Sequence, residues 1–103
     1  MCQMFAGQDP ATYEYETRSL RLNGQSTSIR LERAFWNALT DIAGAEEIST
    51  PQFLSKLHSE VLELHGEVRN FTSLLRCACL VHFDQMAHAS PAAAPMSPQI
   101  AAE

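Results

Sequence analysis

The dipeptide Asn23-Gly24 constrains the fold most, because it stands between two segments in which apolar and polar residues alternate. Residues 18–22 precede the dipeptide, and residues 26–31 follow it as the return strand. Asparagine and glycine accept the positive φ angles that a two-residue type I′ turn requires at both central positions. We therefore predict a β-hairpin closed by Asn23 and Gly24.

The same turn fixes which residues of the two strands lie opposite each other. A two-residue turn sets Leu22 opposite Gln25 and, further along, Ser19 opposite Ser28. Side chains alternate between the two faces of a strand, so the hairpin has two distinct faces. One face carries Leu20, Leu22, Thr27, Ile29 and Leu31, and the other carries Ser19, Arg21, Ser26, Ser28 and Arg30. We expect the first face to pack on a core, whereas the second is polar and basic.

Helical periodicity replaces the alternation directly after the return strand. We predict a first helix that begins near Glu32 or Arg33 and ends by Gly44 or shortly after it. Its apolar stripe consists of Phe35, Trp36, Leu39, Ile42 and Ala43. A single stripe of this kind indicates a helix with one face on a core.

A second helix is indicated by Ser49-Thr50-Pro51-Gln52, which follows a short link. A hydroxyl residue can cap the start of such a helix. Proline is tolerated in the first turn, because the backbone N–H that it lacks would have no hydrogen-bond partner within the helix. Gly66 is a suitable stop. The apolar stripe of this helix consists of Phe53, Leu54, Leu57, Val61 and Leu64.

The rest of the chain divides into a third helix and two flanking segments. Residues 71–83 predict a helix that is too apolar to be surrounded by water, so it must pack on something. We interpret residues 1–15 as a flexible or loosely docked arm and residues 87–103, rich in alanine and proline, as a disordered tail. The expected domain therefore spans residues 16–86.

Length and charge bear on what such a domain binds. A chain of 103 residues buries only a modest core unless a second copy contributes to it, which favours a dimer. The net charge of −5 disfavours DNA binding when taken alone, because DNA affinity depends largely on neutralised phosphates. Between Thr17 and Trp36, however, four arginines stand against the single Glu32, a local balance of +3. One surface can therefore be basic while the molecule is acidic.

A strand, an adjoining helix, a tight link and a second capped helix follow one another in the order of a known family. Residues 27–39 resemble the strand and first helix of the ribbon-helix-helix family, which includes the Arc and MetJ repressors, and residues 48–54 resemble its turn and second helix. Residues 18–83 look like a bacterial subfamily with an added leading strand and a trailing helix. The resemblance implies a mainly α homodimer whose short β-ribbon enters the major groove of DNA. It also implies a role in transcriptional regulation.

The resemblance assigns functions to individual residues. Ser26, Ser28 and Arg30 point outward and are expected to contact bases, with Arg30 able to donate to guanine O6 and N7. Phosphate contacts are expected at the start of the second helix and from the flanking strand, at Ser49, Thr50 and Arg21. The expected dimer core consists of Ile29, Leu31, Phe35, Trp36, Leu39, Phe53, Leu57 and Val61. The roles of Arg18 and Arg33 depend on where the strand and helix ends fall.

Residues that could bind a metal ion occur at two places. His58 and His65 are seven residues apart on the second helix, and Cys77, Cys79 and His82 are close together in the third. No Cys-x-x-Cys spacing occurs, and the two cysteines would point about 200° apart on a helix. We expect reduced thiols and no metal site.

Enzymatic and membrane roles find little support in the sequence. His82 and Asp84, the groups nearest to a thiol, lie where the chain leaves its core, and no phosphate loop or paired-carboxylate motif is present. We expect no enzyme, no cofactor, no membrane span and a cytoplasmic location. The alternative to a DNA-binding regulator is a protein-interaction module on the same dimer, which would use the third helix, the arm or the tail.

Overall fold

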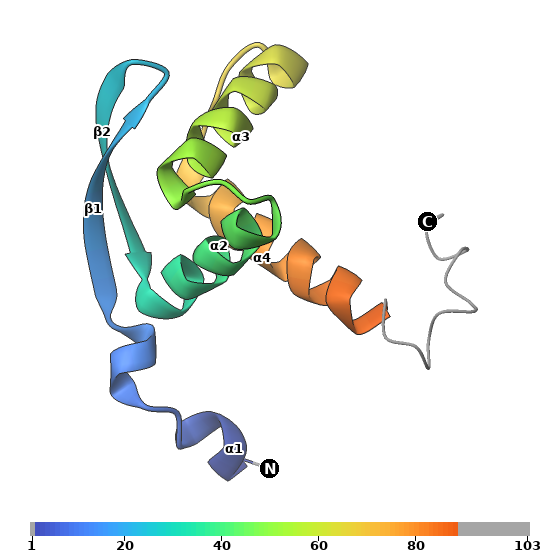
Figure 1. The fold of residues 1–103 in the computed structure, drawn as a ribbon. Helices are drawn as coiled ribbons and strands as arrows, with labels where there is room; N and C mark the ends of the chain where they lie inside the picture. Colours follow the sequence, from blue (N-terminus) through green and yellow to red (C-terminus); the bar gives the residue numbers. More distant parts are fainter. Residues whose placement is uncertain (1, 89–103) are drawn as a thin grey trace.

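The computed structural model describes residues 2–88 and shows a hairpin standing beside three longer helices (Figure 1). Within these residues the sheet has two antiparallel strands, and most of the chain is helical. The elements in chain order are α1 (Cys2–Ala6), the 3₁₀ helix η1 (Pro10–Tyr13), β1 (Tyr15–Leu22), β2 (Gln25–Glu32), α2 (Arg33–Ala45), α3 (Thr50–His65) and α4 (Phe71–His88). This arrangement confirms the predicted fold class, a mainly α fold with a short hairpin and a third long helix.

The hairpin has the predicted turn and register. Asn23 and Gly24 adopt φ angles of 51° and 85°, and Leu22 lies opposite Gln25. Pairing continues to Tyr15 opposite Glu32, so both strands are longer than the alternation alone indicated. On β2 the inward Ile29 and Leu31 are buried, while the outward side chains are exposed. The predicted division into a core face and a polar face is therefore confirmed.

The helix boundaries follow from local chemistry. α2 begins directly after β2, and α3 begins with a complete capping box in which Ser49 and Gln52 satisfy each other's backbone N–H groups. Gly66 ends α3 in the left-handed region at φ 78°, as its position predicted. α4 continues to His88, beyond the predicted end at residue 83.

Parts of the predicted arm and tail are helical in the structure. The N-terminal segment contains α1 and η1, and Asp9 caps η1 through a 3.1 Å bond from the N–H of Ala11. The N–H of Arg33 also donates to the carbonyl of Glu14 at 2.8 Å, which ties the end of this segment to the start of α2. Its flexibility stays a prediction. Of the predicted tail, Ala87 and His88 belong to α4, and residues 89–103 lie outside the described residues.

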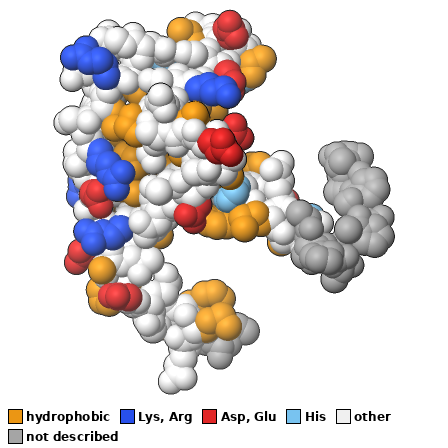
Figure 2. Space-filling model, in the orientation of Figure 1, with side chains coloured by type: hydrophobic (Ala, Val, Ile, Leu, Met, Phe, Trp, Pro, Cys, Tyr) orange, Lys and Arg blue, Asp and Glu red, His pale blue; other side chains and the backbone are white. Residues whose placement is uncertain are grey.

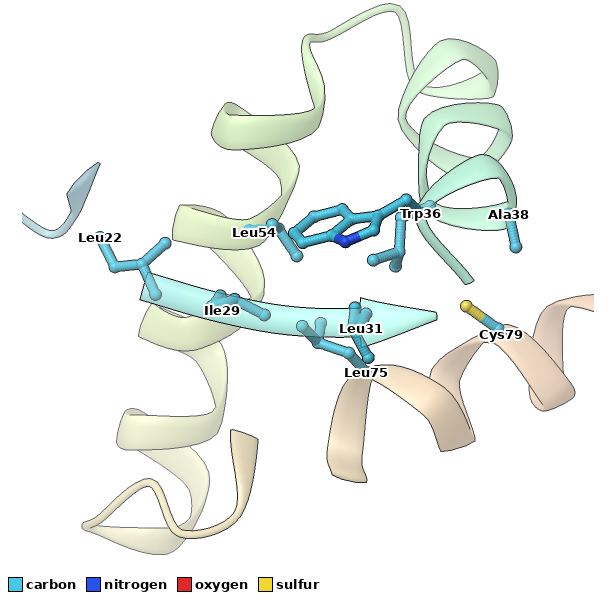
Figure 3. Packing of buried hydrophobic residues seen from close by; sticks show 9 residues of the cluster. Leu22, Ile29, Leu31, Trp36, Ala38, Leu54, Leu75 and Cys79 are labelled. Atoms are coloured by element: carbon cyan, nitrogen blue, oxygen red, sulfur yellow. The ribbon is translucent and has the colours of Figure 1, made fainter. Parts of the chain in front are cut away.

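The core lies between the inner face of the hairpin and the three long helices (Figure 3). Each of these elements contributes buried side chains, so no pair of elements forms the core alone. The buried cluster consists of Leu22, Ile29, Leu31, Trp36, Ala38, Leu39, Leu54, Leu75 and Cys79. Burial raises the pKa of the Cys79 thiol to about 11, so this group is a protonated, unreactive part of the packing.

Trp36 has the largest side chain of this cluster and links β1 to α2. Its ring is fully buried, and its Nε1 donates a 2.8 Å hydrogen bond to the carbonyl of Glu16. The guanidinium of Arg18 lies over the same ring, 4.4 Å from its centroid. The indole therefore combines apolar burial with a polar bond to the added strand.

Replacing Trp36 with phenylalanine should lower the free energy of unfolding by about 1–3 kcal/mol, because the variant loses the indole donor and part of the buried volume. Urea unfolding, with wild type and variant at the same protein concentration, measures the change. A midpoint equal to that of the wild type would contradict this role of the indole.

Two glycines provide a matched pair for testing the turn. A methyl group at either Gly24 or Gly44 meets no atom within 4 Å, but Gly24 has a φ of +85°, whereas Gly44 lies inside α2. Gly24→Ala should therefore destabilise the fold by about 1 kcal/mol, and Gly44→Ala should stabilise it by up to about 1 kcal/mol. Urea midpoints that move in the same direction for both variants would contradict the left-handed turn.

Candidate nucleic-acid interface

The outer face of the hairpin is an exposed surface made by alternate residues of both strands. β2 contributes Ser26, Ser28 and Arg30, which are all exposed, and β1 places Ser19 and Arg21 beside them. The structure thus brings together the three predicted base-contacting residues and one predicted phosphate contact. Burial of the alternate residues on the opposite face holds these side chains outward.

Arg30 differs from the other arginines in how its guanidinium is held. The guanidinium groups of the other five arginines bind partners within the chain. Arg18 and Arg33 pair with Glu16 at 2.6 and 3.6 Å, and Arg76 pairs with Glu32 at 3.0 Å. Arg69 pairs with Glu67 at 3.2 Å, and Arg21 donates to the carbonyl of Gly24 at 2.9 Å. Within residues 2–88, Arg30 makes neither an ion pair nor a side-chain hydrogen bond; instead its guanidinium lies over the ring of Tyr15, 4.1 Å from the centroid. Its N–H donors therefore remain available to a ligand.

The ion pairs also settle the positions of Arg18 and Arg33, which the sequence left open. Both are bound to Glu16, and Arg18 lies on the inner side of β1 against Trp36. The positive balance of this stretch is therefore not all presented outward. Lys and Arg side chains lie along the hairpin side of the molecule, with acidic side chains close to some of them (Figure 2).

The start of α3, the predicted phosphate site, has few donors left. The capping box uses the N–H groups of Ser49 and Gln52, and Pro51 has none. This leaves the backbone N–H of Thr50 as the first-turn donor for a phosphate. The Thr50 hydroxyl also lies 3.4 Å from that of Thr40. Phosphate binding by Ser49 and Thr50 stays a prediction.

The backbone of β2 has one open edge. Residues that flank a two-residue turn exchange both hydrogen bonds, and such pairs alternate with non-bonded pairs along an antiparallel ladder. The odd-numbered residues of β2 therefore bond to β1, and the backbone groups of Ser26, Ser28 and Arg30 point away from it. No third strand covers this edge in the described part of the chain. An open edge of this kind is suited to pair with a second strand.

The tip of the hairpin and the outer edge of β1 are held against α3 by polar side chains. Ser55 donates to the carbonyl of Arg21 at 3.0 Å, and Ser59 donates to the side-chain oxygen of Asn23 at 2.7 Å. The Asn23 amide also lies 2.9 Å from Nδ1 of His58. These contacts could not be predicted from apolar stripes, which do not show where polar side chains bind. The available signal was the four-residue spacing of Ser55 and Ser59, which puts both on one side of the helix.

A second contact that the sequence did not predict joins α4 to the end of β2. Arg76 donates to both carboxylate oxygens of Glu32, at 3.0 and 3.4 Å. The pKa of Glu32 is lowered, first by a hydrogen bond with its own backbone and then by Arg76, against an opposing effect of burial. This pair neutralises the acidic residue that ends β2.

The predicted dimer-core residues fall into two groups. Ile29, Leu31, Trp36 and Leu39 are already buried within one chain. The other four are only half-buried, and they are Phe35, Phe53, Leu57 and Val61. A partner chain is therefore not needed to bury the first group, whereas the second group offers apolar surface to one.

Metal sites and membrane-spanning helices are two further features that the described residues lack. The part of the chain that the structure describes holds no cluster of three or more side chains able to bind a metal ion. No described helix combines the length and apolar character needed to cross a membrane. Cys77 is exposed and Cys79 is buried, and both are free thiols.

Comparison with known proteins identifies the family. A model of the ribbon-helix-helix domain matches residues 15–83, which includes the hairpin and the three long helices up to most of α4. The chain belongs to the ribbon-helix-helix family. The family match agrees with the hairpin, open edge and helix order described above.

One solved structure extends the likeness beyond the family domain. An uncharacterized protein from Bordetella pertussis Tohama I is 36% identical to this ribbon-helix-helix chain, with a TM-score of 0.84, over 93% of this chain and 79% of that one. No curated protein matches. Ribbon-helix-helix domains are regulatory folds that generally bind DNA as dimers, so DNA binding is the function of the family to which this chain belongs.

The lowered pKa of Glu32 gives the fold a dependence on pH. The pKa of Glu32 lies below its ordinary value of 4.5, so its contribution to stability is complete above pH 4.5 and is lost as pH falls through the lowered pKa. Urea unfolding at a series of acidic pH values should therefore show a smaller loss for Glu32→Gln than for the wild type. Glu67→Gln removes a more exposed ion pair and should follow the wild type. If stability depended on pH equally in all three proteins, the contribution assigned to Glu32 would be wrong.

Proposed function

We propose that this chain is a homodimeric transcriptional regulator that reads the major groove of DNA with an antiparallel ribbon of two β2 strands. The open edge of β2 supports the pairing, because its unpaired backbone groups need hydrogen-bond partners. The half-buried Phe53, Leu57 and Val61 supply apolar surface that a second copy would cover. A small chain gains both strand pairing and core from one dimer contact.

The available donors of Arg30 are the observation that carries the proposal. On an exposed face, a planar guanidinium with unused N–H groups can donate to O6 and N7 of one guanine. Ser26 and Ser28 stand on the same face, and their hydroxyls both donate and accept. We propose that these three residues contact bases, and that Arg21, Ser49 and Thr50 contact phosphates.

The acidic net charge is compatible with this role because of where the charges lie. Glu32, at the end of the outer face, is neutralised by Arg76, and Glu16 is bound by Arg18 and Arg33. Arg21 and Arg30 therefore act on the outer face without an unpaired acidic neighbour there. The role proposed is one of binding and involves no catalysis, and it implies a bacterial protein that acts in the cytoplasm, where its DNA is.

A protein-interaction module is the second candidate, and α4 favours it. The second half of α4 extends away from the other helices (Figure 1), with hydrophobic side chains visible along it (Figure 2). The exposed hydrophobic side chains of this half are Leu80, Val81, Phe83 and Met86. An exposed apolar helix of this kind suits a protein partner, which the family fold can hold in addition to DNA.

Substituting Arg30 tests the reading site. A duplex selected by the wild-type protein from a random-sequence pool serves as the probe, and fluorescence anisotropy measures binding. Arg30→Ala should weaken binding to this duplex by about 1–3 kcal/mol. Arg69→Ala removes the same charge from the loop between α3 and α4, where Arg69 pairs with Glu67, and should have a much smaller effect. Equal losses for both variants would reject Arg30 as the reader.

Salt dependence separates the two candidate functions. A regulator that neutralises phosphates should lose DNA affinity steeply as salt rises, because binding releases counterions. The wild-type protein should therefore bind the selected duplex at low salt and release it as salt increases. Weak retention on any duplex at low salt would instead favour the protein-interaction module.

A further inference from the structure

Tyr15 contacts Arg30 from the neighbouring strand, on the outer face of the hairpin. In the register of the hairpin, Thr17 lies directly opposite Arg30, and Tyr15 is two residues from Thr17 on the same face. Tyr15 is therefore a diagonal neighbour of Arg30, within reach of a long side chain. The guanidinium carbon of Arg30 lies 4.1 Å from the centroid of its ring.

This contact holds Arg30 without using its hydrogen bonds. A guanidinium that stacks on an aromatic ring contacts it through its flat face, while its N–H groups point outward in its own plane. An ion pair, such as that of Arg76 with Glu32, uses those N–H groups instead. Stacking is therefore the kind of contact that can fix an arginine and leave its donors to a base edge.

Tyr15 has little other role in the described structure. Its side chain is 53% exposed, and it lies outside the buried cluster that holds the hairpin on the helices. Its neighbour on β1, Glu16, instead binds Trp36, Arg18 and Arg33. An exposed ring at this position thus contributes little to the stability of the fold. Its main contact is the one that constrains Arg30.

We propose that Tyr15 is a positioning residue for base recognition, which restricts the Arg30 guanidinium to orientations that present its donors to guanine. The inference rests on the proposed function. Restricting a long side chain before binding lowers the conformational entropy that is lost when the contact with DNA forms. The added leading strand is then part of the reading surface, because it supplies the ring.

The test compares Tyr15→Val, Tyr15→Phe and Tyr13→Val on two duplexes. One is the duplex selected by the wild-type protein, and the other has the same base composition in shuffled order. Tyr15→Val keeps the strand propensity of the position but removes the ring, and should weaken binding to the selected duplex about two- to fivefold, the range for an exposed cation–π contact. Binding to the shuffled duplex should not change, because phosphate contacts do not involve the ring.

Two controls identify the ring as the cause. Tyr15→Phe keeps the aromatic face and should bind the selected duplex like the wild type. Tyr13→Val removes an exposed tyrosine from η1, outside the hairpin, and should also bind like the wild type. Equal losses on both duplexes for Tyr15→Val, or no loss on either, would overturn the proposal.

A double-mutant cycle separates this inference from the proposed function. If Tyr15 acts through Arg30, Tyr15→Val should cost nothing further in an Arg30→Ala background. A further loss in that background would overturn the positioning role. If Arg30→Ala itself leaves binding unchanged, the reading site of the proposed function fails. If Arg30→Ala weakens binding and Tyr15→Val does not, only the role of Tyr15 fails.

Discussion

The burial of Trp36 is the interaction on which the arrangement of the hairpin depends. Its ring joins the core formed by α2, α3 and α4, while its Nε1 holds the carbonyl of Glu16 on β1. An isolated two-stranded hairpin is at best marginally stable in water, so β1 and β2 need this attachment to the helices. The carboxylate of the same Glu16 binds Arg18 and Arg33, so both arginines are engaged within the chain. The residue that the buried indole holds is thus also the one that pairs with two of the arginines.

Local features of the fold could be predicted because their causes are local. The turn at Asn23-Gly24, the strand register and the capping box of α3 each depend on residues within a few positions of one another. The contacts that were missed include some between residues more than thirty positions apart, such as Ser59 with Asn23 and Arg76 with Glu32. Periodicity shows which side chains are buried, but it does not show which polar groups of different elements bind each other. The extension of α4 to His88 was missed for a related reason, since apolar content falls there while the helix continues.

The candidate site shows the same division. Alternation along β2 was sufficient to place Ser26, Ser28 and Arg30 on one exposed face. It did not show that most arginines bind partners within the chain, because the acidic partners of Arg18, Arg33 and Arg76 come from both strands of the hairpin. Arg30 is the exception because its neighbour on β1 is an aromatic ring and not a carboxylate. Arg21, the other outward arginine, is instead engaged by the carbonyl of Gly24, so of the two only Arg30 keeps all its N–H donors.

In the proposed dimer, the two-residue turn would couple base reading to dimer formation. It makes the odd-numbered residues of β2 bond to β1, so the backbone groups at the open edge belong to Ser26, Ser28 and Arg30. Along a strand, side chains alternate between the two faces and backbone hydrogen-bonding groups alternate between the two edges, both with a period of two residues. The side chains of these three residues therefore face outward, while their backbone groups lie at the open edge. In the proposed dimer, hydrogen bonds to the partner strand would fix the backbone of each reading residue. Pairing of the two strands would then place both sets of readers side by side on one face, which a single chain cannot do.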